Sequence, residues 1–134
     1  MITADHTSSE IQFPEGRTAW GFYSVPLIIF KPDNSLAAER QEIAQQIDIM
    51  PSVLGYINFD KPYVAFGRNL FSDGERPFAL NYKDNVYQYF EGDYLLQFDG
   101  IISVGLYDIK SDKLMANNLL TIFSGCGWAD GTKN

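Results

Sequence analysis

The feature that most constrains this chain is Val25-Pro26-Leu27-Ile28-Ile29-Phe30, an apolar run without alternation. Such a run is typical of a strand covered on both faces, as in a parallel sheet. A parallel strand also needs neighbouring strands. The chain offers one candidate partner, the short segment Ile2–Asp5. We therefore expect a partial parallel sheet, completed by the rest of a larger protein or covered by another copy of the chain.

Ser35–Ile57 is the predicted helical region, because its apolar residues recur at helical spacing: Leu36, Ile43, Ile47, Met50 and Leu54. Proline is tolerated in the first turn of a helix but not in its interior. The sequence therefore predicts a break near Asp48, with Pro51 opening a second short helix that runs through Leu54.

After Phe59 the apolar period changes from helical spacing to two, which predicts strands. The expected strands include residues 78–82, 86–90, 94–98 and 101–107. A Lys-Asp-Asn turn separates the first two strands, and Asp99-Gly100 predicts a two-residue hairpin turn between the last two. The chain is therefore expected to be α/β, or α+β within this segment, with an antiparallel meander of about four strands after the partial parallel sheet.

Composition excludes several classes of protein. The hydrophobic fraction of 46% favours an ordered core over disorder. The net charge is −7 and the ten basic residues are scattered, which argues against nucleic acid or an anionic membrane as a partner. No apolar stretch approaches ~20 residues, and no signal pattern opens the chain. Alone, the chain is expected to be soluble.

The candidate chemistry begins with Asp5 and His6, where the first apolar segment gives way to a polar loop. Ligand sites in α/β folds collect at the carboxyl ends of strands, and a carboxylate and an imidazole both bind divalent cations. The pair lacks further ligands nearby, and His6 is the only histidine. From spacing alone, a solvated polar pair in a loop is favoured over a metal site.

Other candidates carry weaker signals. Adjacency to His6 does not make a catalytic triad of Thr7, Ser8 and Ser9, which are expected to hydrogen-bond or cap the loop. Cys126 is expected to be a structural or incidental thiol, because no second histidine could activate it. Four tyrosines could stack on sugars, although cross-strand packing is favoured: Tyr82, Tyr87, Tyr89 and Tyr94.

Four segments in order sharpen this interpretation: "ITADH", "RTAWGFYSVPLIIFKPDN", "QIDIMPSVLGYI" and "FGRNLF", followed by "FALNYKDNVYQYFEGDYLLQFDG". Together they resemble the carboxyl-terminal part of sulfatase-like enzymes of the alkaline phosphatase superfamily. Within it they are similar to the branch of lipoteichoic acid synthase-type phosphoglycerol transferases. The resemblance spans about residues 2–120, and the tail "TIFSGCGWADGTKN" departs from it.

The resemblance implies that Asp5 and His6 are ligands of an active-site divalent cation, which could be manganese, calcium, magnesium or zinc. It implies no catalytic residue in this chain, because the family's threonine or modified cysteine or serine nucleophile lies far upstream. Its substrate-binding residues stay unknown. Asp48 is expected to be structural, its carboxylate accepting from helix-start N–H groups.

The sequence thus predicts one domain, residues 1–134, that forms the C-terminal part of a sulfatase-like catalytic domain. Residues 1–60 would end the α/β core, residues 61–120 would form an antiparallel subdomain, and 121–134 would be a tail. The expected partners are the remainder of the parent enzyme and a second copy bound through exposed strands. The parent is expected to be anchored in the inner membrane, with this domain periplasmic or extracellular. The alternative is a non-catalytic module that binds an envelope glycan or a protein.

Overall fold

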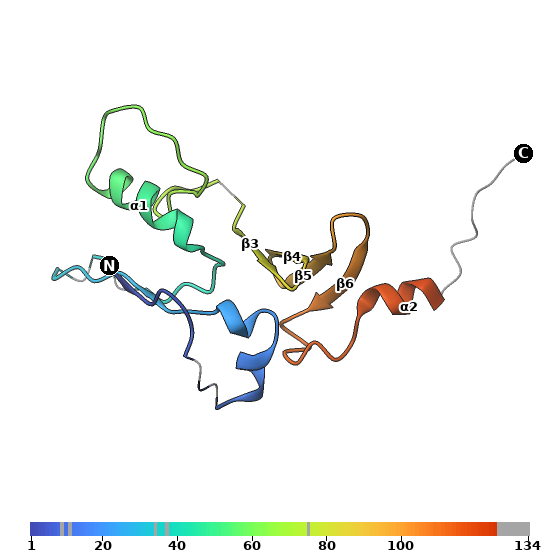
Figure 1. Ribbon diagram of the computed structural model, residues 1–134. Coiled ribbons are helices and arrows are strands. Elements are labelled where there is room, and N and C mark those ends of the chain that lie inside the picture. Colours follow the sequence, from blue (N-terminus) through green and yellow to red (C-terminus); the bar gives the residue numbers. More distant parts are fainter. Residues whose placement is uncertain (9, 11, 34, 37, 75, 126–134) are drawn as a thin grey trace, which may run out of the picture.

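The structure is a computed structural model of residues 1–134, and it describes all of them except 9, 11, 34, 37, 75 and 126–134. Its dominant element is a four-stranded antiparallel sheet of order β3-β4-β5-β6, and a small separate sheet joins β1 to β2 (Figure 1). The elements in chain order are β1 (Ile2–Thr3), the 3-10 helices η1 (Pro14–Arg17) and η2 (Gly21–Tyr23), β2 (Leu27–Ile28), the 3-10 helix η3 (Gln46–Asp48), α1 (Ile49–Tyr56), β3 (Phe78–Lys83), β4 (Val86–Glu91), β5 (Tyr94–Phe98), β6 (Ser103–Asp108) and α2 (Leu119–Gly125).

The predicted meander is confirmed, and its first turns explain its register. Asp84 and Asn85 both have positive φ, 54° and 62°, as a two-residue type I′ turn requires. They link Lys83 to its partner Val86. Gly92 supplies a positive φ of 58° in the next two-residue turn. These tight turns fix which side chains share a face of the sheet.

The predicted turn at Asp99-Gly100 is wrong in length. Phe98 pairs with Ser103, so four residues connect β5 to β6, and the register shifts at Gln97 and Phe98. Gly100 has the expected positive φ of 101°. The Asp99 carboxylate instead accepts from the backbone N–H groups of Ile101 and Ile102, both at 2.8 Å, which stabilises the wider turn.

The core lies on one face of the meander. Phe90 and Leu95 are cross-strand partners and are the buried hydrophobic residues of the described chain. Gln88, on the same face, is also buried. Tyr82, Tyr87 and other aromatic residues occupy the opposite face, where both of these rings are about half exposed. The sheet therefore has one packed face and one open aromatic face.

Side chains occupy both outer edges of the meander. At the β3 edge, the Leu80 N–H donates to Oε1 of Gln45 at 3.1 Å. At the β6 edge, Asn118 accepts from the Leu106 N–H and donates to the Val104 carbonyl, both at 3.1 Å. The Asn118 side chain therefore bonds to the edge much as a neighbouring strand would, just before α2 begins.

The first sheet corrects the predicted parallel pairing. β1 and β2 pair antiparallel, with Ile2 opposite Ile28 and Thr3 opposite Leu27. The apolar run forms a strand only at these two residues, and Ile28 and Phe30 are 52% and 71% exposed. Parallel strands need a long crossover connection, usually a helix, whereas antiparallel strands do not. Two short segments can therefore pair here without further strands.

The helical prediction is half right. Pro51 lies in the first turn of α1, where its missing N–H costs no hydrogen bond, and the break at Asp48 is the end of η3. The expected helix before Asp48 is wrong, because residues 38–45 form no regular element. Arg40 and Gln45 in this segment bond instead to Leu70 and Leu80. These side-chain contacts hold the segment against the 68–71 loop and β3.

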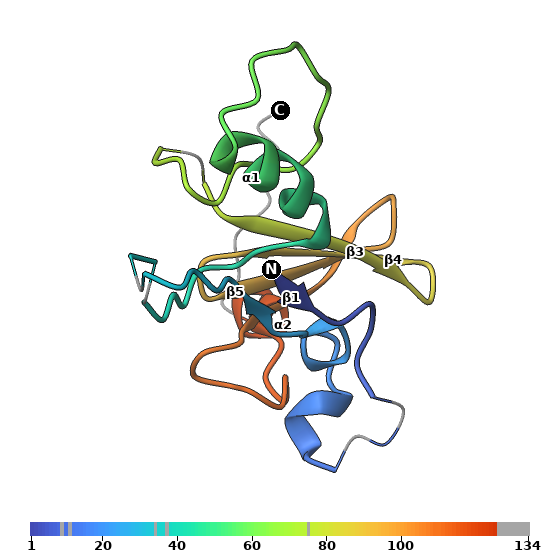
Figure 2. The same cartoon turned by 90° about the vertical axis from the view of Figure 1, so that its left-hand side faces the viewer.

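The chain is open rather than spherical (Figure 2). Its solvent-accessible area is 10322 Å², whereas a folded monomer of 15.2 kDa exposes about 7,100 Å². The residues that the structure does not describe would contribute at most roughly 2,200 Å² of this excess, even if they were as exposed as in an unfolded chain. The described residues thus expose apolar surface that a compact domain would bury. Among their helices, none combines the length and the apolar character needed to cross a membrane.

Candidate functional site

The predicted ligands Asp5 and His6 follow β1 after one intervening residue, Ala4. Gln46, at the start of η3, donates through Nε2 to the carbonyls of Ala4 and Asp5, both at 3.0 Å. The Thr7 hydroxyl donates to the Phe22 carbonyl at 2.8 Å. These bonds anchor the backbone on both sides of His6, while the two predicted ligand side chains point into solvent.

The two side chains face each other. Nε2 of His6 lies 3.7 Å from Oδ2 of Asp5, and the side chains are 79% and 88% exposed. Nδ1 of His6 lies 2.7 Å from the Thr7 carbonyl, and the His6 backbone N–H donates to Oδ1 of Asp5 at 3.0 Å. The bond to Thr7, followed by the charge of Asp5, raises the pKa of His6 above its usual 6.5. Since a carbonyl oxygen can only accept, Nδ1 is the donor in the bond to Thr7. Nε2 is then left to interact with a cation or with the Asp5 carboxylate.

This arrangement can hold part of a metal site. A metal-binding histidine commonly donates its other ring N–H to a backbone carbonyl, as His6 does toward Thr7. Asp5 and His6 also border an open groove of about 980 Å³ between residues 20–25, residues 43–47 and β3. Within the described residues, however, no three His, Cys, Asp or Glu side chains gather closely enough to complete a site. The pair could therefore supply two ligands and would need others.

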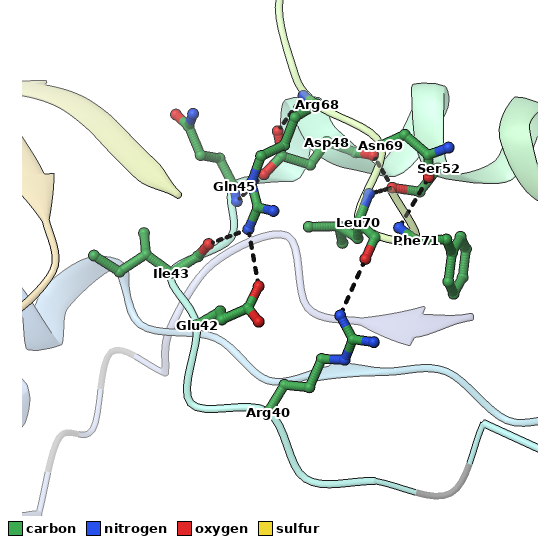
Figure 3. Close-up of polar contacts among 10 residues, drawn as sticks. All are labelled: Arg40, Glu42, Ile43, Gln45, Asp48, Ser52, Arg68, Asn69, Leu70 and Phe71. Carbon is green, nitrogen blue, oxygen red and sulfur yellow. Dashed lines mark hydrogen bonds and ion pairs between the residues drawn. The ribbon is translucent and has the colours of Figure 1, made fainter. Parts of the chain in front are cut away.

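A second polar centre is buried at the start of α1 (Figure 3). The Asp48 carboxylate, 1% exposed, accepts from the backbone N–H groups of Gln45 and Arg68, both at 2.9 Å. Ser52, fully buried, donates to the Asp48 carbonyl at 2.6 Å and accepts from the Leu70 N–H at 2.9 Å. Asp48 is structural and accepts from a helix-start N–H group as predicted, that of Gln45 at the start of η3, and it also joins η3 to the 67–70 loop.

Sequence reasoning missed Arg68, which lies in this centre. Its Nη2 donates to the Ile43 carbonyl at 2.8 Å and lies 3.7 Å from Oε2 of Glu42. The close approach of the loop requires Gly67, since a Cβ there would lie 2.3 Å from the Ile47 carbonyl oxygen. The glycine directly before the arginine in "FGRNLF" was a sequence signal for a close backbone approach at this point, but it does not indicate which residues Arg68 contacts.

The remaining candidates take up structural contacts. Ser8 accepts from the Glu10 N–H at 3.1 Å, as expected of a loop serine. Ser9 and Cys126 lie outside the described residues. Three of the four tyrosines pack across strands, as predicted: Tyr82 and Tyr87 are 4.7 Å apart between ring centroids, and Tyr89 stacks on Phe78 at 5.8 Å.

Comparison with known proteins adds no assignment: no family model, no curated protein and no solved structure matches this chain.

Proposed function

We propose that the chain is one part of a metal-dependent, sulfatase-like hydrolase or phosphoglycerol transferase, and that Asp5 and His6 bind its divalent cation. The observation that carries the proposal is the geometry of the pair. Two exposed ligand groups face each other while the Thr7 carbonyl holds the imidazole through Nδ1. The order of the sequence motifs supports the same proposal.

A bound cation would polarise the sulfate or phosphate ester and stabilise the attacking oxygen. The donor set of one carboxylate and one imidazole fits manganese or zinc better than calcium, which prefers oxygen ligands alone. Two ligands are too few for tight binding, since catalytic zinc sites use three protein ligands. The remaining ligands and the nucleophile would come from the rest of the parent enzyme, which would also cover the open apolar surface.

The single histidine makes the metal proposal directly measurable. We expect MnCl₂ to broaden the imidazole NMR signals of His6 and nearby amides selectively, with weak affinity. His6→Gln and Asp5→Asn should each abolish the broadening. Asp60→Asn is the matched control, because Asp60 is a similarly exposed carboxylate whose ion pair is with neighbouring Lys61. Broadening that survives His6→Gln, or that centres elsewhere, would refute the assignment.

We expect no turnover by this chain alone. With Mn²⁺ or Zn²⁺ present, 4-nitrophenyl sulfate and bis(4-nitrophenyl) phosphate should be hydrolysed at the rate of buffer containing the same metal. Turnover above that rate that disappears in His6→Gln would show that these residues form a complete active site, contrary to the proposal.

The open aromatic face of the meander supports a second candidate function, a module that binds an envelope glycan. Tyr82, Tyr87 and Tyr94 are 56%, 44% and 51% exposed on this face. Exposed aromatic rings are suited to stacking on sugar rings. Glycan-array binding that Tyr87→Ala abolishes, and that His6→Ala leaves unchanged, would favour this module. Tyr63→Ala is the control, because Tyr63 is 45% exposed but lies outside the sheet.

A further inference from the structure

A cavity of about 530 Å³ separates the β1–β2 sheet from the segment 38–46 and the 68–71 loop. This volume is in the range of small-molecule sites. Its charged lining residues are Arg40, Glu42 and Arg68, which give it a net positive charge in a chain of net charge −7. Asp5 and His6 do not line this cavity, so a ligand bound there need not touch the proposed metal site.

Arg68 is a buried cation with incomplete compensation. Its side chain is only 7% exposed, and its one ion pair within the described part of the chain joins Nη2 to Glu42 at 3.7 Å, with Glu42 itself half exposed. Its Nε is buried, and no acceptor among the described residues lies within hydrogen-bonding distance. A buried charge is costly unless it is paired and hydrogen-bonded. The guanidinium group therefore favours an additional anion nearby.

Arg40 supplies a second guanidinium group to the same cavity. It reaches the Leu70 carbonyl through Nη1 at 3.3 Å, its one hydrogen bond among the described residues, and it is exposed. In Figure 3, the Arg40 side chain extends toward Leu70 and the Arg68 side chain extends toward Glu42, from opposite directions. Arginine is well suited to binding phosphate and carboxylate groups, because its planar donors match their oxygens.

The uncharged walls combine an apolar side, which includes Leu27, Ile29, Leu36, Leu70 and Phe71, with polar side chains such as Gln45 and Gln46. Inorganic phosphate would fill only a small part of this space, whereas an alkyl chain would cover the apolar walls. We infer that the cavity binds an amphiphilic organic anion, with its phosphate-type head at Arg40 and Arg68 and its apolar chain between β2 and the 68–71 loop.

Octyl phosphate, kept below its micelle concentration, is the probe. In calorimetry at neutral pH we expect saturable one-to-one binding, with amide shifts at residues 40–46 and 68–71 in NMR spectra. Arg40→Gln should weaken binding about tenfold or more, the effect of losing one charge-assisted bond. Glu42→Gln should strengthen it several-fold, because that carboxylate repels the head group and competes for Arg68. Opposite signs from neighbouring residues separate ligand recognition from a loss of folding.

The controls isolate the head group and the position. Octan-1-ol and inorganic phosphate should each bind at least tenfold more weakly than octyl phosphate. Arg76→Gln should leave binding unchanged, because Arg76 is 90% exposed and pairs with Glu91 on the meander. Equal affinities for wild type, Arg40→Gln and Glu42→Gln would overturn the inference, as would octan-1-ol binding as tightly as octyl phosphate.

Discussion

Replacing Asp48 by asparagine should weaken the link between η3 and the 67–70 loop. The carboxylate accepts from two backbone N–H groups, those of Gln45 and Arg68, at 2.9 Å each, and it is 1% exposed. Asparagine keeps the shape but turns an amide NH₂ toward one of these donors. The change removes a charge-assisted bond, worth about 1.5–3 kcal/mol, and leaves a buried N–H unpaired, at about 1–3 kcal/mol. Both figures describe the same N–H donor and so are not simply added, and we expect a loss of about 2–4 kcal/mol in the free energy of unfolding.

Urea unfolding followed by circular dichroism measures the global loss, and amide hydrogen exchange measures it locally. If the Arg68 amide exchanges through an opening that breaks its bond to Asp48, its exchange should rise roughly 30- to 700-fold, since about 1.4 kcal/mol corresponds to a factor of ten. Asp60→Asn, at an exposed carboxylate, should change neither quantity measurably. Unchanged exchange at Arg68 in the Asp48→Asn protein would refute the role assigned to this carboxylate.

Three further outcomes are expected. His6 should titrate with a pKa above 6.5 in NMR, and Asp5→Asn should lower that pKa. Since folding raises the pKa, protonated His6 stabilises the fold fully at a pH below the pKa of the unfolded chain. This stabilisation is lost as the pH rises through the pKa of the folded chain. Gly67→Ala should lower the urea midpoint, since its Cβ would lie 2.3 Å from the Ile47 carbonyl oxygen. Sedimentation velocity should show self-association through the exposed β1–β2 sheet, stronger at high salt because like net charges repel; a monomer at every concentration would contradict this.

The meander was predictable because its signals are local. Alternation with period two marks each strand, and Asp84-Asn85 adopts the positive φ angles that a tight hairpin requires. The turn at Asp99 was misjudged because its carboxylate bonds to two backbone N–H groups and stabilises a longer connection. A prediction made from the residue types of a turn alone does not take such side-chain bonds into account.

The first half was less predictable because its contacts are not local. Residues 38–45 contain good helix formers, yet Arg40 and Gln45 bond to residues 30 and 35 positions away. The apolar run at β2 indicated burial, whereas this chain leaves Ile28 about half exposed. A pattern can indicate that a strand needs cover, but it cannot say whether the same chain supplies that cover.

The buried centre at Asp48 also supports both proposed sites. Asp48 ends η3, and Gln46 at the start of this 3-10 helix holds the Ala4 and Asp5 carbonyls that precede His6. Asp48 also fixes the Arg68 backbone, which places the guanidinium group against the second cavity. Since one buried carboxylate bonds to both η3 and the 67–70 loop, these two segments are held together within the otherwise open half. A partner that covers the exposed apolar surface would therefore meet preformed ligand groups rather than having to order them on binding.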